Sequence, residues 1–223
     1  MSTSSKSIPE LSAILLSETA QKTYGAEIAA AAPNVRRLLV SDALAKEIAD
    51  TDTAQGVFAI AKMRQELEAL PQTKSRCLLL HCLQDPANLG AILRTADALG
   101  TDGVYLYQCC DLYNPKTVRS TMGALFRVPI RRIRNMDEFF GHCRNIQLPT
   151  CAAVVDRDAK PLQKYDFSGG AVVMIGNEGN GLPREVSDAC TAKLTIPMSA
   201  QANSLNAAMA AGLFLWEMTR YRE

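Results

Sequence analysis

From Cys77 onward, short apolar runs alternate with stretches of helical periodicity. The apolar runs have no helical period and are too short for buried helices, which is typical of strands buried on both faces. The expected strands are Cys77–Leu83, Val104–Tyr107, Val128–Ile133, Cys151–Val155, Ala171–Ile175 and Lys193–Ile196. The expected helices are a stretch that ends at Leu99, then Asn114–Leu125, Met136–Ile146, Pro183–Cys190 and Ser204–Arg220. This alternation predicts an α/β fold, a parallel sheet flanked by helices on both faces.

The residues before this region follow a different pattern. They are rich in Ala, Ser and Thr, with short apolar runs at Val35–Val40 and Gly56–Ile60. The charged segment Arg64–Lys74, which contains Pro71, is typical of a linker. We therefore expect a small N-terminal α/β unit with its linker over residues 1–74, and a larger domain over residues 75–223.

The last expected helix is apolar on nearly every side. Its large apolar side chains cannot share one narrow stripe: Leu205, Met209, Leu213, Phe214, Leu215 and Trp216. A helix of this kind is buried on most of its surface. In a chain of this size, an interface between two subunits would bury it, which predicts a homodimer. The alternative is an ordinary central helix within one subunit.

Composition narrows the class of protein. Of 223 residues, 48% are hydrophobic and 21% are charged, which is typical of a globular chain and excludes extensive disorder. The longest apolar stretch, Ala207–Trp216, is shorter than the roughly 20 residues that span a bilayer, so no membrane association is expected. The N-terminal residues lack the order of a secretory signal. The expected location is the cytoplasm, with an organellar origin left open.

Charge and cysteine content limit the possible partners. The chain has 24 Lys and Arg against 23 Asp and Glu, so a surface for nucleic acid would have to be a local patch. Its seven cysteines have no regular spacing and form no Cys-x-x-Cys pair, and there are only two histidines. We expect buried thiols in a reducing compartment and no metal site.

Three segments at the expected carboxyl ends of strands carry the candidate chemistry, because open parallel sheets bind ligands there. The first is Asp85–Arg94. Asn88 is expected at or before the helix start, where its amide can bind backbone groups. Arg94 would project from an otherwise apolar helix, where it needs an anionic partner or solvent. Taken alone, Arg94 fits a surface position as well as an active site.

The second segment, Gly176–Pro183, directly follows an expected strand. Its glycine order, G-x-x-G-x-G, matches neither the dinucleotide-binding fingerprint nor a Walker loop. Three glycines permit a tight turn and a close approach of the backbone to a ligand. An ordinary turn is the alternative, but turn geometry does not require the acidic Glu178.

The third segment is Ile196–Met198, followed after a short loop by Asn203–Asn206 at the head of the last helix. Ser204 is expected to cap this helix. Asn206 would face apolar surroundings and must therefore find hydrogen-bond partners.

In this order, the three segments resemble the signatures of the SpoU (TrmH-like) branch of the SPOUT methyltransferases. These enzymes are S-adenosylmethionine-dependent RNA ribose 2′-O-methyltransferases. The stretch Asn114–Ile130, with the run Ser120–Ala124 and the following Pro129, is also similar to that family. The likeness extends from Cys77 to Arg220.

The N-terminal region has a weaker resemblance. Val35–Met63, with the run Thr53–Val57, is similar to the end of the L30e-like substrate domain that many members carry, in a shortened form. The sequence departs from the family pattern at Asn203, where an acidic or small residue is common, and at Ala207, where Val is usual.

The resemblance implies a fold, a cofactor and a set of site residues. The fold is a parallel sheet whose C-terminal segment forms a deep trefoil knot, which holds S-adenosylmethionine, in a homodimer. The implied cofactor-binding residues are Gly176, Ile196, Leu205, Val154, Asn177 and Gly181, with Asp156 beside them. The implied catalytic group is Arg94, oriented by Asn88, Glu178, Ser204 and Asn206.

The resemblance also implies the substrate, guanosine in ribosomal RNA, with transfer RNA as the alternative. Its phosphates would contact a basic patch formed by Arg119, Arg127, Arg131 and Arg132, unless this patch is simply a solvated strand end. Other possibilities are a non-catalytic RNA-binding member of the fold, a Rossmann-type or commoner methyltransferase fold, and a structural dimerisation module. The glycine order argues against the Rossmann-type and commoner methyltransferase folds, and the polar residues at the strand ends argue against the dimerisation module.

Overall fold

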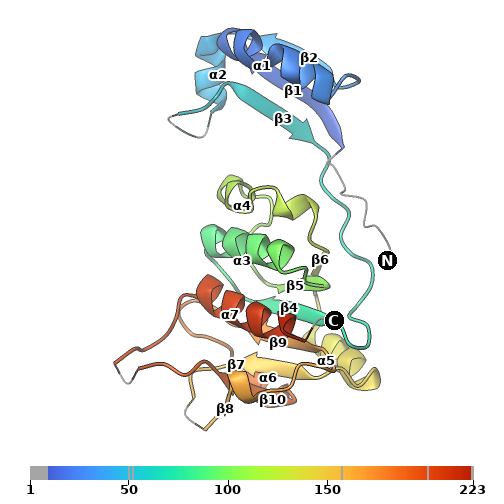
Figure 1. Cartoon of the computed structure of the whole chain (residues 1–223), viewed down its shortest axis with the longest axis vertical. Coiled ribbons are helices and arrows are strands. Elements are labelled where there is room, and N and C mark those ends of the chain that lie inside the picture. The colour runs from blue at the N-terminus through green and yellow to red at the C-terminus, as the bar shows by residue number, and fades with distance from the viewer. Residues whose placement is uncertain (1–9, 50, 52, 157, 200, 222–223) are drawn as a thin grey trace. The chain divides into compact units, whose positions relative to one another are not determined.

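A computed structural model gives the architecture of the chain (Figure 1). It describes residues 10–49, 51, 53–156, 158–199 and 201–221. The chain divides into two compact units, Met1–Gln65 and Glu66–Glu223.

The smaller unit is a three-stranded sheet with two helices. Its elements in chain order are β1 (Leu11–Ser17), α1 (Glu18–Ala31), β2 (Arg36–Val40), α2 (Asp42–Ile48) and β3 (Val57–Ala61). β1 lies in the middle, parallel to β2 and antiparallel to β3. Ile14, Leu16 and Ala20 form its small core. The two expected apolar runs are β2 and β3, whereas the central strand β1 was not expected.

The larger unit is built on a seven-stranded sheet in the order β6-β5-β4-β9-β7-β10-β8, in which every paired strand is parallel to its neighbour. The strands are β4 (Arg76–His81), β5 (Gly103–Tyr107), β6 (Ile130–Arg132), β7 (Thr150–Ala153), β8 (Lys160–Pro161), β9 (Ala171–Ile175) and β10 (Ala192–Thr195). Six of them occupy the apolar runs that the sequence predicts. The parallel α/β fold is therefore confirmed, and the short edge strand β8 is an addition.

Helices cover both faces of this sheet (Figure 1). They are α3 (Pro86–Ala98), α4 (Pro115–Ser120), α5 (Met136–Asn145), α6 (Arg184–Ala189) and α7 (Ala207–Thr219), with 3₁₀ turns at Ala124–Phe126 and Leu162–Lys164. Alternate residues of β4 enter different cores: Leu78 and Leu80 pack with residues of α3 and α7, and Cys77 and Leu79 with residues of α5. Burial on both faces explains why the strand sequence shows no polar alternation.

The single helix expected over Asn114–Leu125 is wrong. Asn114 caps α4, which ends at Ser120, and a separate 3₁₀ turn begins at Ala124. Between them, Met122 and Gly123 both have positive φ, 49° and 83°. The left-handed backbone cannot continue a right-handed helix, so the chain turns there.

The segment expected to be a linker belongs mostly to the larger unit. The boundary between the units lies between Gln65 and Glu66 rather than after Lys74. The Leu67 amide donates to the carbonyl of Ile130 in the edge strand β6 (2.7 Å), and Leu67 packs against the core on the α5 face. Apolar residues between the charges therefore anchor this segment to the sheet.

The described helices include none that is long and apolar enough to cross a bilayer. All seven cysteines are free thiols, three of them buried and four partly buried. Among the described residues, no three or more His, Cys, Asp or Glu side chains gather as metal ligands would.

Candidate active site

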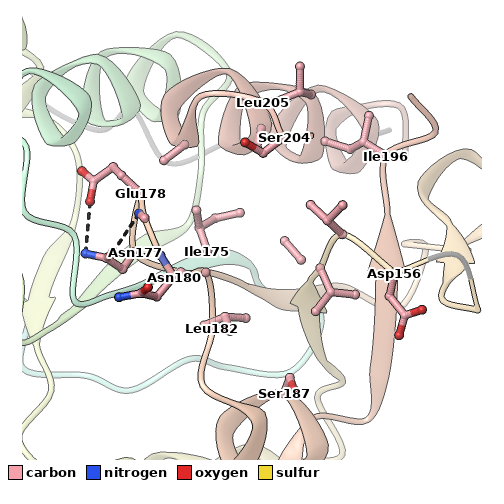
Figure 2. Close-up of a pocket in the computed structure, with 18 of the residues that line it drawn as sticks. Asp156, Ile175, Asn177, Glu178, Asn180, Leu182, Ser187, Ile196, Ser204 and Leu205 are labelled. Atoms are coloured by element: carbon pink, nitrogen blue, oxygen red, sulfur yellow. Dashed lines mark hydrogen bonds between the residues drawn. The ribbon is translucent and has the colours of Figure 1, made fainter. Parts of the chain in front are cut away.

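A pocket of about 800 Å³ lies where the carboxyl ends of β7 and β9 meet the segments after β10. Figure 2 shows Ile196 and Leu205 on one side of it and Leu182 on the other, with Glu178 and Asp156 toward opposite ends. All six residues expected to bind the cofactor line this pocket, together with Asp156, Glu178 and Ser204: Val154, Gly176, Asn177, Gly181, Ile196 and Leu205. The tertiary structure thus gathers residues from three separate loops.

The glycine-rich turn is closed by its own hydrogen bonds. Asn177 and Gly181 exchange backbone bonds (3.1 and 2.9 Å), and the Asn177 side-chain oxygen accepts from the amides of Gly179 (2.9 Å) and Asn180 (3.2 Å). Gly181 has a φ of 66°. A Cβ at Gly176 would lie 2.1 Å from the Gly181 carbonyl carbon. The turn therefore requires a glycine at 176 for reasons of packing alone.

Glu178 projects from this turn to the start of α3. Its carboxylate accepts hydrogen bonds from the amides of Gln84 (3.1 Å) and Asp85 (2.9 Å), and from the Asn88 side chain (3.2 Å). Burial raises the pKa of Glu178, but the backbone donors outweigh burial, and the net pKa is lowered. Glu178 is therefore an ionised acceptor at neutral pH.

Asn88 links Glu178 to the head of α7. Its side-chain oxygen accepts from the Asn206 amide (2.9 Å), and the Asn206 oxygen in turn accepts from the amides of Ala208 and Met209. Two capping expectations are wrong. Asp85 caps α3, which makes Asn88 the third helical residue, and Asn206 rather than the exposed Ser204 caps α7. Each cap is the residue whose side chain reaches the free amides of the first turn.

Arg94 does not join this network within one chain. Arg94 lies six positions after Asn88 in the chain. This offset places it about 9 Å further along the helix axis and about 120° around it. The side chain is exposed, and within the described part of the chain no hydrogen bond or ion pair reaches its guanidinium. A free, exposed guanidinium is available to an anion from outside the chain.

The arginines expected to contact RNA have acceptors within the chain. Arg127 pairs with Asp97 (2.6 and 2.8 Å), Arg132 pairs with Glu66, and Arg131 donates to the carbonyl of Glu68. Each guanidinium has five N–H donors, so these partners occupy only part of its capacity and a phosphate would share it with them. Arg119 lies in the last turn of α4.

Cysteines near the site are protonated thiols. Burial is the main cause that raises the pKa of Cys82, of Cys110 and of Cys109, the last to about 12. Because the thiolate is the reactive form, these residues are unsuited to covalent catalysis at neutral pH.

Sequence reasoning missed several residues of the site. Leu182, Met198 and Phe214 line the pocket, and Gln84 contacts Glu178 through its amide. Leu182 and Met198 lie inside the segments already singled out, so their position was a usable signal. Phe214 is indistinguishable in sequence from its apolar neighbours in α7.

The sequence model of the SpoU rRNA Methylase family matches residues 75–216 of this chain. The chain belongs to this family. The match covers the whole seven-stranded sheet and all three loops of the pocket, which confirms the expected membership. An L30e-like character of the smaller unit stays a prediction.

Several relatives of this SpoU family member are known. RlmP of Bacillus subtilis, a 23S rRNA guanosine 2′-O-methyltransferase, is 32% identical over 181 residues, 81% of this chain and 71% of RlmP. An uncharacterised tRNA/rRNA methyltransferase of Synechocystis is 35% identical over 192 residues, 85% of this chain and 69% of that protein.

Solved structures of SpoU and rRNA methyltransferases are also similar to this chain. AviRb from Streptomyces viridochromogenes, a SpoU methyltransferase crystallised with S-adenosylmethionine, has a TM-score of 0.83 at 26% identity, over 95% of this chain and 83% of AviRb. An rRNA methyltransferase from Sinorhizobium meliloti with the same ligand bound has a TM-score of 0.82 at 30% identity, over 96% of this chain and 81% of that one.

Proposed function

We propose that this chain is an S-adenosylmethionine-dependent ribose 2′-O-methyltransferase that acts on guanosine in ribosomal RNA. One observation carries the proposal: all six residues expected to bind the cofactor line the same pocket. Similarity to RlmP supports ribosomal RNA and guanosine as the target.

The residues of the pocket suit this cofactor. Gly176 lets the backbone of the glycine-rich turn close tightly, which leaves main-chain groups to bind polar edges of a ligand. Ile196, Leu205 and Leu182 provide apolar walls for a flat ring. Glu178 and Asp156 are carboxylates in the same pocket, and they suit a ligand that carries a sulfonium and an ammonium group.

When bound, S-adenosylmethionine supplies a methyl group on a sulfonium, whose thioether is a good leaving group. Arg94 would bind a phosphate of the RNA and stabilise the negative charge that develops on the attacking 2′-oxygen. Arg94 is not the base, because a guanidinium has hydrogen-bond donors and no acceptor. The hydroxyl proton passes to the phosphate or to water, and Glu178, Asn88 and Asn206 hold the loops that position the ribose.

We also propose a homodimer. α7 exposes Met209, Leu213 and Trp216, of which Trp216 is 60% exposed and Met209 58%. These residues are four and three positions apart and share one face of the helix. A second copy covering this face would lie beside the pocket, as the family resemblance implies. The trefoil knot, which the resemblance also implies, stays a prediction.

Cofactor binding and methyl transfer can be measured separately. We expect calorimetry to detect S-adenosylmethionine binding to the purified chain, and labelled methyl groups to appear on ribosomal RNA. Arg94→Ala should keep its cofactor affinity and lose roughly 100-fold or more in transfer, because Arg94 acts on the RNA phosphate and on the developing negative charge rather than on the cofactor.

Other results of these measurements would change the proposal in different ways. Cofactor binding without transfer to any RNA would favour the non-catalytic alternative, and transfer to transfer RNA alone would overturn the ribosomal assignment. Mapping 2′-O-methyl sites in total RNA with and without the protein identifies the target. No heat with S-adenosylmethionine would overturn the proposal.

A further inference from the structure

Two neighbouring strands end in unusual backbone, and one of these ends is hydrogen-bonded to Asn177, which lines the pocket. Cys82 follows β4 and Gln108 follows β5, and both have positive φ, 55° and 50°. The register of the two strands places these residues side by side. Neither is a glycine, so each left-handed conformation is unfavourable by itself and needs support from its surroundings.

Gln84 supplies a support that bridges both residues. Its side-chain Nε2 donates to the carbonyl of Cys82 (3.2 Å) and to the carbonyl of Gln108 (3.3 Å). A primary amide has two N–H donors, one for each carbonyl. Because both partners are carbonyl oxygens, only the nitrogen end of the Gln84 amide can face them. The Asn177 side chain also donates to the carbonyl of Cys82 (2.8 Å).

The same residue contacts Glu178, which lines the pocket, through its backbone. The amide of Gln84 donates to Glu178, as does the amide of Asp85. The left-handed turn at Cys82 sets the direction of the chain two residues before these donors. The side chain of Gln84 therefore fixes the backbone that presents its own amide to Glu178.

We infer that Gln84 is a positioning residue for methyl transfer. Its side chain clamps the ends of β4 and β5, and thereby holds Glu178, Asn88 and Asn206 in register with the pocket. It acts through the backbone and neither binds the cofactor nor contacts the reacting atoms. This inference rests on the proposed function.

The test compares Gln84→Met with the wild-type protein. Methionine keeps the length of the side chain and removes both donors. We expect kcat to fall roughly 10- to 100-fold, because a small misplacement of reacting groups has an effect of this size. The KM for RNA and the Kd for S-adenosylmethionine should stay within about twofold, because Gln84 touches neither in this account.

A second variant separates the clamp from a direct contact. In Gln84→Met combined with Cys82→Gly, residue 82 adopts positive φ without help while Gln108 stays without its support, so part of the lost kcat should return. Gln147→Met is the matched control, since Gln147 is exposed and its side chain has no hydrogen-bond partner among the described residues. Its kinetics should equal those of the wild type.

Three results would overturn the inference: an unchanged kcat in Gln84→Met, a raised KM for RNA with kcat intact, or no rescue by Cys82→Gly. Each assumes that the wild-type protein transfers methyl groups in the same assay. A wild-type protein without transfer activity would instead overturn the proposed function.

Discussion

Glu178 is held by donors from four positions, the amides of Gln84 and Asp85 and the side chains of Asn88 and Asn177. A carboxylate is acceptor-only when ionised, so it matches this set of donors. Its lowered pKa keeps it ionised over the whole neutral range. Proton transfer at Glu178 is therefore not expected to shape the pH dependence of the reaction near neutrality.

Replacing Glu178 with Gln tests this role. One carboxylate oxygen becomes an NH₂ group that faces a backbone N–H, so at least one hydrogen bond is lost. We expect the free energy of unfolding to fall by about 1–3 kcal/mol, measured by urea denaturation. The rate of methyl transfer should also fall, by the same factor at every pH between about 6 and 9, because Glu178 stays ionised throughout this range.

Glu27→Gln is the control for this substitution, because Glu27 is exposed on α1 and its carboxylate has no hydrogen bond or ion pair among the described residues. It should leave stability and transfer unchanged. A loss of transfer in Glu178→Gln that appears only on the acid side would assign a proton to Glu178 and contradict the acceptor role.

At the scale of elements, α3 approaches α4 through a single glycine. A Cβ added at Gly90 would lie 2.4 Å from the Cβ of Ser120 and 2.7 Å from the carbonyl oxygen of Thr117. The helices could not keep this separation with any larger residue. This contact fixes α4 against the helix that carries Asn88 and Arg94.

We expect Gly90→Ala to destabilise the protein by about 1–3 kcal/mol, because overpacking forces the helices apart. Gly141→Ala in α5 is the matched control: the nearest atom to its Cβ would be the end of Arg144, at 4.0 Å. Alanine there should stabilise by about 0.5–1 kcal/mol, since glycine is a poor helix former. Equal urea midpoints for the two variants would contradict this account of α3–α4 packing.

At the scale of the whole molecule, the exposed apolar face of α7 predicts self-association. Trp216→Lys places a charge in the proposed interface, and we expect light scattering to show a monomer where the wild-type protein is a dimer. Met63→Lys is the control, because Met63 is 72% exposed and lies in the smaller unit. A wild-type monomer, or a dimer that persists in Trp216→Lys, would contradict the proposed interface.

The sequence by itself determined six of the seven strands of the larger unit and the helices that alternate with them, apart from the break between α4 and the 3₁₀ turn at Ala124. Apolar runs such as Ala171–Ile175 are long enough to be strands, and their burial on both faces removes any polar alternation. The three loop segments were also identifiable, because Gly, Asn and Glu side chains at strand ends are not required by the core. Local pattern was enough for these features, since each depends on residues close together in the chain.

Only the tertiary structure decided how distant residues meet. The bond between Asn206 and Asn88 joins positions 118 residues apart, and the Glu178 to Gln84 bond joins positions 94 apart. The hydrogen bond from the Leu67 amide to the Ile130 carbonyl of β6 likewise joins segments that are far apart in the chain. Hydrogen bonds and close packing select among locally equivalent residues, and that selection exists only once the chain has folded.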